Sequence, residues 1–345
     1  MITDKPGSVP SPDDVPSRDD VPSPDDVHAL QQAVRVVSSV VVGQHAMVER
    51  LMIVLLARGH CLLEGVPGVA KTLAARTFAV VAGGSFARLQ FTPDLVPSDI
   101  VGTRIYRPSA ETFDIELGPV FVNFVLADEV NRAPAKVQAA MLELMAEHQV
   151  SLGGRSFPLP EPFTVIATQN PLESEGVYPL PEAQRDRFLL KVDVPLPRAH
   201  EEAEILRRMS VDPPAAHRVL TVDQVVRLQH AADRVYVHPL VSDYVVRLVM
   251  ATRSPAEYGL AELAPVLEVG ASPRATLGLV AAGRAMALLH GRDHLLPADV
   301  QALAVDVMAH RLVLGFDAVA DGISARSVVE RVLAVVPQPV PSLVG

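Results

Sequence analysis

The sequence contains little sulfur and few aromatic residues. Its 345 residues include one cysteine and no tryptophan, and aromatic residues make up 4% of a chain that is 49% hydrophobic. A single cysteine excludes an internal disulfide, and Cys61 lies in an apolar segment, where a small core residue is expected. The core must therefore consist mainly of Val, Leu and Ala, and the chain is long enough for two domains with cores of their own.

The chain also lacks segments that would direct it to a membrane. No run of about 18 uncharged apolar residues occurs, which argues against a membrane span. The N-terminus has neither the basic region nor the apolar stretch of a secretory signal. With a lone cysteine, these absences predict a protein of the reducing cytoplasm.

Positive charge is scarce as well. The chain has 30 Lys and Arg but 40 Asp and Glu, which gives a net charge of −10. An acidic body does not suit tight, sequence-blind binding to phosphate backbones, so nucleic acid is not the expected partner. About half of this charge lies in residues 1–27, which repeat VPSPDD, VPSRDD and VPSPDD and have no apolar periodicity. We expect a disordered linker there, with an acidic docking tail as the alternative.

Residues 61–72 read CLLEGVPGVAKT, an apolar segment followed by a loop and the start of a helix. The spacing of Gly65, Lys71 and Thr72 is typical of a phosphate-binding loop, whose backbone N–H groups cradle β- and γ-phosphates. Lys71 would reach the phosphates and the Thr72 hydroxyl would bind Mg²⁺. Ala70 replaces the second glycine of the strict motif, and its small side chain still allows close approach. The expected nucleotide-binding residues of the loop are Gly65, Val66, Pro67, Gly68, Val69, Ala70, Lys71, Thr72 and Leu73.

A second apolar run, residues 124–127, ends in Asp128 and Glu129. A buried parallel strand delivers its C-terminal carboxylates to the same sheet edge as the phosphate-binding loop. Asp128 can hold the Mg²⁺ shell, and Glu129 can orient and deprotonate the attacking water. The separation from Lys71 leaves room for about one helix, a middle strand and an insert. The phosphate-binding loop and the strand that ends in Asp128 and Glu129 together predict a Mg-ATP site.

A third apolar segment, residues 163–168, ends in Gln169 and Asn170. A polar side chain at this point can contact the γ-phosphate or the attacking water. The alternative is that Asn170 simply begins a turn with Pro171. Residues 181–188 then read as a short polar helix that precedes an apolar strand at 188–192.

Six stretches of the chain, spread over about residues 28–336, resemble the MoxR family of AAA+ ATPases. They are GVPGVAKT, LQFTPDLVPSDIVG, ADEVNRAPAKVQAAMLELMAE, VIATQNP, LPEAQRDRF and GASPRA. The resemblance implies an α/β fold, with a P-loop core that has a parallel sheet and hairpin inserts, followed by an all-helical lid domain. We therefore expect a tail at 1–27, an AAA+ core at 28–197 and a lid at 198–345.

The resemblance also assigns individual residues. Asn170 matches the first sensor, Arg187 the arginine finger offered to the neighbouring subunit, and Arg274 the second sensor on the lid. Val42 and Gly43 match the entry to the adenine pocket, although they also fit an apolar helix end with a glycine cap. The resulting catalytic set is Glu129, Asn170, Arg187 and Arg274, and the metal ligands are Thr72 and Asp128.

Two excursions from the core and several lid helices are expected. Residues 105–117 and 149–158 read as hairpins, the second around Gly153-Gly154. Their positions match inserts of the clade to which MoxR-like proteins belong and which usually face a central pore; plain surface loops are the alternative. Apolar periodicity predicts lid helices at 198–209, 221–234, 239–252, 273–290 and 297–314.

The resemblance implies a homo-oligomeric ring, expected to be a hexamer, that uses ATP and Mg²⁺ to remodel or mature protein complexes. A client protein and a partner with a von Willebrand factor A domain are implied by the resemblance alone. The alternative is a nucleic-acid motor or a subunit of a restriction-type complex, which basic and aromatic hairpin residues would favour. A nucleotide-gated scaffold without hydrolysis is a third possibility, and the set Lys71, Asp128 and Glu129 argues against it.

Overall fold

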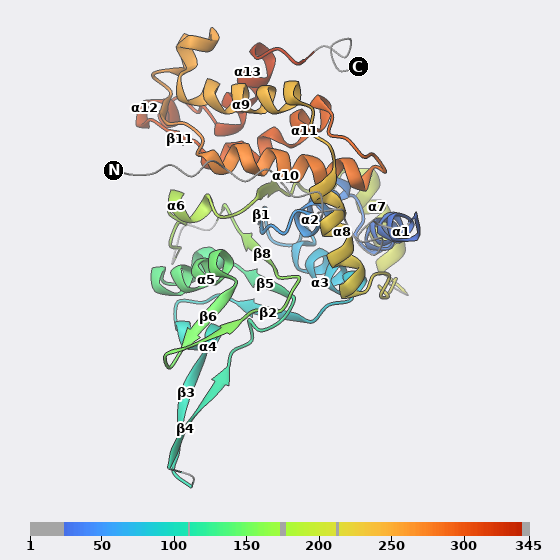
Figure 1. Ribbon diagram of the computed structural model, residues 1–345, viewed down its shortest axis with the longest axis vertical. Helices are drawn as coiled ribbons and strands as arrows, with labels where there is room; N and C mark the ends of the chain where they lie inside the picture. Colours follow the sequence, from blue (N-terminus) through green and yellow to red (C-terminus); the bar gives the residue numbers. More distant parts are fainter. Residues whose placement is uncertain (1–23, 110, 173–176, 212–213, 340–345) are drawn as a thin grey trace, which may run out of the picture.

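A five-stranded parallel sheet lies at the centre of the molecule (Figure 1). The computed structural model describes residues 24–109, 111–172, 177–211 and 214–339. In spatial order the strands are β2 (Phe86–Gln90), β5 (Phe124–Asp128), β8 (Thr164–Gln169), β1 (Cys61–Glu64) and β9 (Leu190–Asp193). The predicted α/β core with a parallel sheet is confirmed.

Alternation along each strand divides the side chains between two apolar clusters. On β1, Cys61 and Leu63 pack into the cluster that includes α2 and α3, whereas Leu62 packs into the cluster that includes α5. Burial raises the pKa of the Cys61 thiol, which fits its predicted place in the core. The helices around the sheet are α1 (Pro24–Val40), α2 (His45–Leu56), α3 (Lys71–Ala82), α4 (Pro97–Val101), α5 (Ala135–Glu147) and α6 (Glu182–Arg185).

Both predicted hairpins are present. The first joins β3 (Gly102–Arg107) to β4 (Thr112–Leu117) and extends far from the sheet (Figure 1). The second joins β6 (Gln149–Leu152) to β7 (Arg155–Pro158). Gly153 and Gly154 form its turn with φ of 58° and 78°, a conformation that glycine adopts readily.

The lid consists of helices that follow the sheet in the chain, and α9, α10, α11 and α13 gather beyond one end of it (Figure 1). Its helices are α7 (Ala199–Met209), α8 (Val222–Arg234), α9 (Pro239–Arg253), α10 (Pro273–Leu289), α11 (Pro297–Met308), α12 (Phe316–Ala320) and α13 (Ala325–Val335). Among the described residues, no helix is long and apolar enough to cross a membrane.

Two details of the lid differ from the sequence prediction. The helix expected to continue to residue 314 ends at Met308, because β11 (Val313–Leu314) pairs antiparallel with β10 (Leu267–Val269). The lid is therefore not all-helical. A short apolar run such as residues 312–314 fits strand and helix equally well on periodicity, and the partner strand decides between them.

The tail boundary at residue 27 is also wrong. Helix α1 begins at Pro24, a residue type that suits a first helical position. Asp26 is buried and pairs with Arg227 of α8 at 3.1 Å. Residues 24–27 therefore belong to the folded part, because the last aspartates of the repeat complement the helix N-terminus and a lid arginine. The predicted disorder of residues 1–23 lies outside the described residues.

Candidate nucleotide-binding site

The loop between β1 and α3 is shaped by one close backbone approach and two left-handed residues. A side chain at Gly65 would place its Cβ 2.5 Å from the carbonyl oxygen of Val194 on the chain after β9, so only glycine fits. Gly68 has a φ of 88°, and Ala70 has a φ of 66° immediately before α3. The left-handed conformation costs alanine about 1–2 kcal/mol. The chain adopts it here because the loop turns into α3 at this residue.

Lys71 lies over this loop at the start of α3. Its Nζ donates to the carbonyl oxygens of Gly65, of Val66 at 3.2 Å and of Gln169 at 3.5 Å. The ammonium group is therefore held where the loop, the helix N-terminus and the end of β8 meet. A cavity of about 310 Å³ opens beside it, lined by Pro67, Gly68, Ala70, Lys71, Thr72, Leu73, Arg88, Asp128, Glu129, Thr168, Gln169 and Asn170.

Asp128, at the end of β5, is buried in the wall of this cavity. Its Oδ2 accepts from the Thr72 hydroxyl at 3.2 Å, and its Oδ1 accepts from the Thr168 hydroxyl at 2.6 Å. A hydroxyl and a carboxylate are the oxygen ligands that Mg²⁺ takes when phosphates and waters complete its shell. Among the described residues, no cluster of three His, Cys, Asp or Glu could hold a metal. The Thr72 hydroxyl and the Asp128 carboxylate, the two predicted ligands, match the oxygen donors that Mg²⁺ takes beside a nucleotide.

Arg88 is a cavity residue that the sequence analysis missed. It lies on β2, and its Nε and Nη2 donate to Asp128 Oδ2 at 3.0 and 2.7 Å. The sequence predicted only a middle strand between the phosphate-binding loop and Asp128, with no functional residue on it. The available signal was the placement of Arg88 and Gln90 at alternate positions of a strand whose carboxyl end lies beside Asp128.

Glu129 follows β5 in a left-handed conformation, with a φ of 59°. Its backbone N–H donates to the Thr168 hydroxyl at 2.9 Å. Its carboxylate accepts from Gln90 Nε2 at 2.9 Å and forms an ion pair with Arg132 at 3.0 Å. A strained backbone held by neighbours on three sides is typical of functional positions. Glu129 lines the cavity, but its carboxylate is already engaged by two side chains.

Asn170 forms the predicted turn and also lines the cavity. It is buried and lines the cavity, where its amide can meet a phosphate or a water. Its Oδ1 also accepts from the Leu172 N–H at 3.1 Å, which closes the predicted turn.

Seven predicted site residues are not among those that line this cavity. Gly65, Val66 and Val69 belong to the phosphate-binding loop itself, and four others lie outside that loop. Val42 and Gly43 lie in the link between α1 and α2, and the link packs on α7, where a Cβ at Gly43 would approach Glu201 Cδ to 2.8 Å. Gly43 comes three residues after α1 ends, so it does not cap that helix. The other two are the arginines Arg187 and Arg274.

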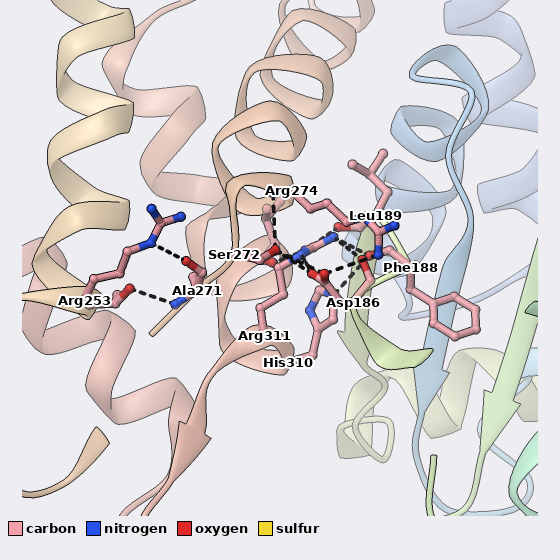
Figure 2. A network of polar contacts seen from close by, with 11 residues as sticks. Asp186, Phe188, Leu189, Arg253, Ala271, Ser272, Arg274, His310 and Arg311 are labelled. Atoms are coloured by element: carbon pink, nitrogen blue, oxygen red, sulfur yellow. Dashed lines mark hydrogen bonds and ion pairs between the residues drawn. The ribbon is translucent and has the colours of Figure 1, made fainter. Parts of the chain in front are cut away.

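Arg187 follows α6, and its guanidinium donates to the carbonyl oxygen of Leu142 on α5. Arg274, at the start of α10, pairs with Asp186 at 3.3 Å (Figure 2). Arg274, which the resemblance identifies as the second sensor on the lid, does not line the cavity beside Lys71. The N-terminus of α10 faces the segment after α6 in this structure, and the second-sensor role of Arg274 stays a prediction.

Comparisons with known proteins agree with this geometry. A model of the ATPase family associated with various cellular activities (AAA) matches residues 60–190, and an AAA lid domain model matches residues 261–332. The chain is 57% identical to the protein named chaperone MoxR1 of Mycobacterium tuberculosis, over 90% of this chain and 83% of that protein. It is 33% identical to the protein MoxR of Methylorubrum extorquens, over 81% and 86% of the two chains.

A solved structure of a proposed ATPase from Cytophaga hutchinsonii has a similar fold. Its TM-score is 0.85 at 44% sequence identity, and the match covers 91% of this chain and 96% of that one.

Proposed function

Because the chain belongs to the MoxR family of AAA ATPases, we propose that it hydrolyses ATP with Mg²⁺ at the cavity beside Lys71. The observation that carries the proposal is the Asp128 carboxylate, which joins Thr72 of the phosphate-binding loop to Thr168 of β8 inside one cavity. In the proposed division, an ATPase core extends from α1 to residue 197, and the lid begins at residue 198.

Each residue of the cavity has a proposed role. The ammonium of Lys71 binds phosphate oxygens in place of the carbonyls that it now contacts. Thr72 and Asp128 hold Mg²⁺, which would neutralise charge that develops on the phosphates. Glu129 leaves Gln90 and Arg132 to orient the attacking water and accept its proton.

The two arginines outside the cavity keep the roles that the family resemblance implies. Arg187, in the segment after α6, is proposed to reach the phosphates of the next copy and stabilise transition-state charge, an effect of about 10³ to 10⁵ in rate for arginine fingers. Arg274 is proposed to leave Asp186 and act as the second sensor on the phosphates bound by Lys71. Activity would then require a homo-oligomeric ring, proposed to be a hexamer.

At the level of the cell, we propose a chaperone-like factor of the cytoplasm that remodels or matures protein complexes. The name of the Mycobacterium tuberculosis relative supports the chaperone assignment. A partner with a von Willebrand factor A domain and a client protein complete the proposal, on the family resemblance alone.

Replacing Glu129 by Gln tests the proposal. The phosphate-binding loop and Asp128 remain, so ATP binding should stay near the wild-type level, while phosphate release should fall by at least about 100-fold, the lower end of what general-base catalysis contributes. Binding and phosphate release are measured on the same sample. Exposed Glu143→Gln on α5 is the matched control and should turn over normally. Wild-type turnover by Glu129→Gln would remove this residue from the role of base.

A further inference from the structure

Arg311 is a buried lid arginine at the contact between the lid and the segment that follows α6 (Figure 2). It ends the short turn after α11, and its side chain is only 3% exposed. Burial lowers its pKa to about 10, so the guanidinium is still charged at neutral pH. A charge that is removed from water in this way needs partners on most of its donors.

Arg311 donates to the Val307 carbonyl of α11 and to three backbone carbonyls that bracket the proposed arginine finger. Its Nη2 donates to the carbonyl oxygen of Phe188 at 2.6 Å and to that of Asp186 at 3.3 Å, and its Nη1 donates to that of Leu189 at 3.3 Å. One rigid guanidinium thus fixes the peptide units before and after Arg187. The planar five-donor group makes this possible, since a single ammonium has no such fork.

The Asp186 side chain gathers further lid groups at the same place (Figure 2). Its Oδ1 accepts from Arg311 Nε at 2.9 Å and from the Ser272 hydroxyl at 2.9 Å. Its Oδ2 pairs with Arg274 at 3.3 Å. His310 adds a bond from its Nε2 to the Phe188 carbonyl at 3.0 Å. The segment that carries Arg187 is therefore fastened to the lid through both its backbone and one carboxylate.

We propose that Arg311 is a positioning residue for Arg187, so that the lid of one subunit sets the geometry of the arginine offered to the next subunit. The inference rests on the proposed action of Arg187 on the neighbouring subunit. The Arg187 side chain donates to the Leu142 carbonyl, and the position of its backbone decides where the guanidinium can reach. When the lid changes its angle relative to the core, the hydrogen bonds of Arg311 move the backbone of the segment after α6 together with the lid. A misplacement of about 1 Å costs on the order of 100-fold in rate when a group must meet a transition state.

The test replaces Arg311 by Lys, which keeps the charge beside Asp186 but cannot donate to three carbonyls in one plane. The matched control is Arg326→Lys, because Arg326 is another lid arginine that pairs with the core, with Asp193 at 2.7 Å, away from the segment after α6. Thermal melting checks that each variant folds. If Arg311→Lys does not fold, Arg311→Gln replaces it, because the neutral amide needs no charged partner and its two N–H groups cannot serve all three carbonyls.

Three readouts are compared, namely binding of a fluorescent ADP, ATP turnover by each variant, and turnover in mixtures with Glu129→Gln. Arg311→Lys should bind ADP normally and turn over about 10- to 100-fold more slowly. Mixing with Glu129→Gln should restore turnover, because the latter supplies a well-placed Arg187 to intact Glu129 sites. Arg326→Lys should behave as wild type. A loss confined to the variant's own nucleotide site would not be rescued in this way.

A reference mixture of Arg187→Ala with Glu129→Gln separates the inference from the function on which it rests. Recovery in the reference mixture together with wild-type turnover by Arg311→Lys would overturn the inference and leave the trans role of Arg187 in place. Recovery of turnover in the reference mixture, but not in the mixture of Arg311→Lys with Glu129→Gln, would also overturn the inference. No recovery in the reference mixture, with mixed assemblies seen by native mass spectrometry, would overturn the trans role and the inference together.

Discussion

Arg88 and the proposed metal ligand Asp128 show how a single side chain can control the state of the cavity. The Arg88 guanidinium lies 2.7 Å from Asp128 Oδ2, and the Thr72 hydroxyl lies 3.2 Å from the same oxygen. A Mg²⁺ shared by Thr72 and Asp128 would bring a second cation to this oxygen, and two cations at such a distance repel each other. We therefore expect Arg88 to leave Asp128 when Mg-nucleotide binds.

Replacing Arg88 by Gln should lower the Mg²⁺ concentration needed for half-maximal nucleotide binding, by about 5-fold if the competing ion pair contributes roughly 1 kcal/mol. Fluorescent ADP titrated with Mg²⁺ gives this midpoint without any need for turnover. Arg76→Gln, at an exposed position on α3, should leave the midpoint unchanged. An unchanged or raised midpoint for Arg88→Gln would show that Arg88 does not compete with the metal.

At the scale of elements, His60 ties three of them together just before β1. Its Nε2 donates to the Met145 carbonyl of α5 at 3.1 Å, and its Nδ1 accepts from the Val165 N–H of β8 at 3.0 Å. Burial, the main cause, lowers its pKa from the ordinary 6.5 to about 4, and His148 acts in the same direction. The neutral ring is therefore part of the folded structure.

The free energy of unfolding should fall as the pH drops from 6.5 towards 4, because the unfolded chain binds a proton at His60 before the folded chain does. The full contribution is present above pH 6.5, and its loss can reach about 3 kcal/mol near the folded pKa. Urea unfolding at pH 7 and pH 4.5 measures the change. His60→Gln should flatten this dependence and His200→Gln, an exposed control, should not. If the unfolding free energy of His60→Gln depended on pH as strongly as that of the wild type, His60 would not be the cause of the dependence.

Helix α1 makes a second prediction at this scale. Deleting residues 1–23 should leave the melting temperature and ATP turnover close to wild type, since the repeat has no apolar face to dock. Asp26→Ala should instead lower stability by about 1–2 kcal/mol, because Arg227 loses a buried partner while remaining partly hydrated itself. Thermal unfolding compares the two. A large loss on deleting 1–23 would contradict the linker interpretation.

The sequence predicts those elements whose signals are local. The parallel strands, both hairpins and the loop from Gly65 to Thr72 follow from apolar runs and glycine positions. The start of α1 and the β10–β11 pair do not, because they depend on partners that are distant in the chain, such as Arg227 for Asp26. The same reason hides Arg88, whose role is set by a neighbouring strand.

Placement of the two arginines was the least predictable part of the site. The motifs identify Arg187 and Arg274 as candidate site arginines. No sequence pattern specifies which cavity a residue of the lid faces. Only the packing of α10 against the segment after α6 puts Arg274 on Asp186 instead of in the cavity of its own chain.

At the scale of the whole molecule, charge and shape bear on the alternative of a nucleic-acid motor. The first hairpin exposes Tyr106 and Phe113, and the Arg104 guanidinium lies 4.0 Å from the Phe113 ring centre. These groups could meet a base or an apolar peptide equally well. The net charge of −10 disfavours the phosphate backbone, so the protein-remodelling proposal remains the stronger of the two.

The central claim is that each catalytic site is completed by a neighbouring subunit. ATP turnover per subunit, measured over a dilution series with native mass spectrometry of the same samples, tests it most directly. Turnover should follow the assembled fraction and vanish with it, while nucleotide binding per subunit persists, because Lys71, Thr72 and Asp128 belong to one chain. A dissociated single chain that turns over at the rate of the assembly would contradict the account.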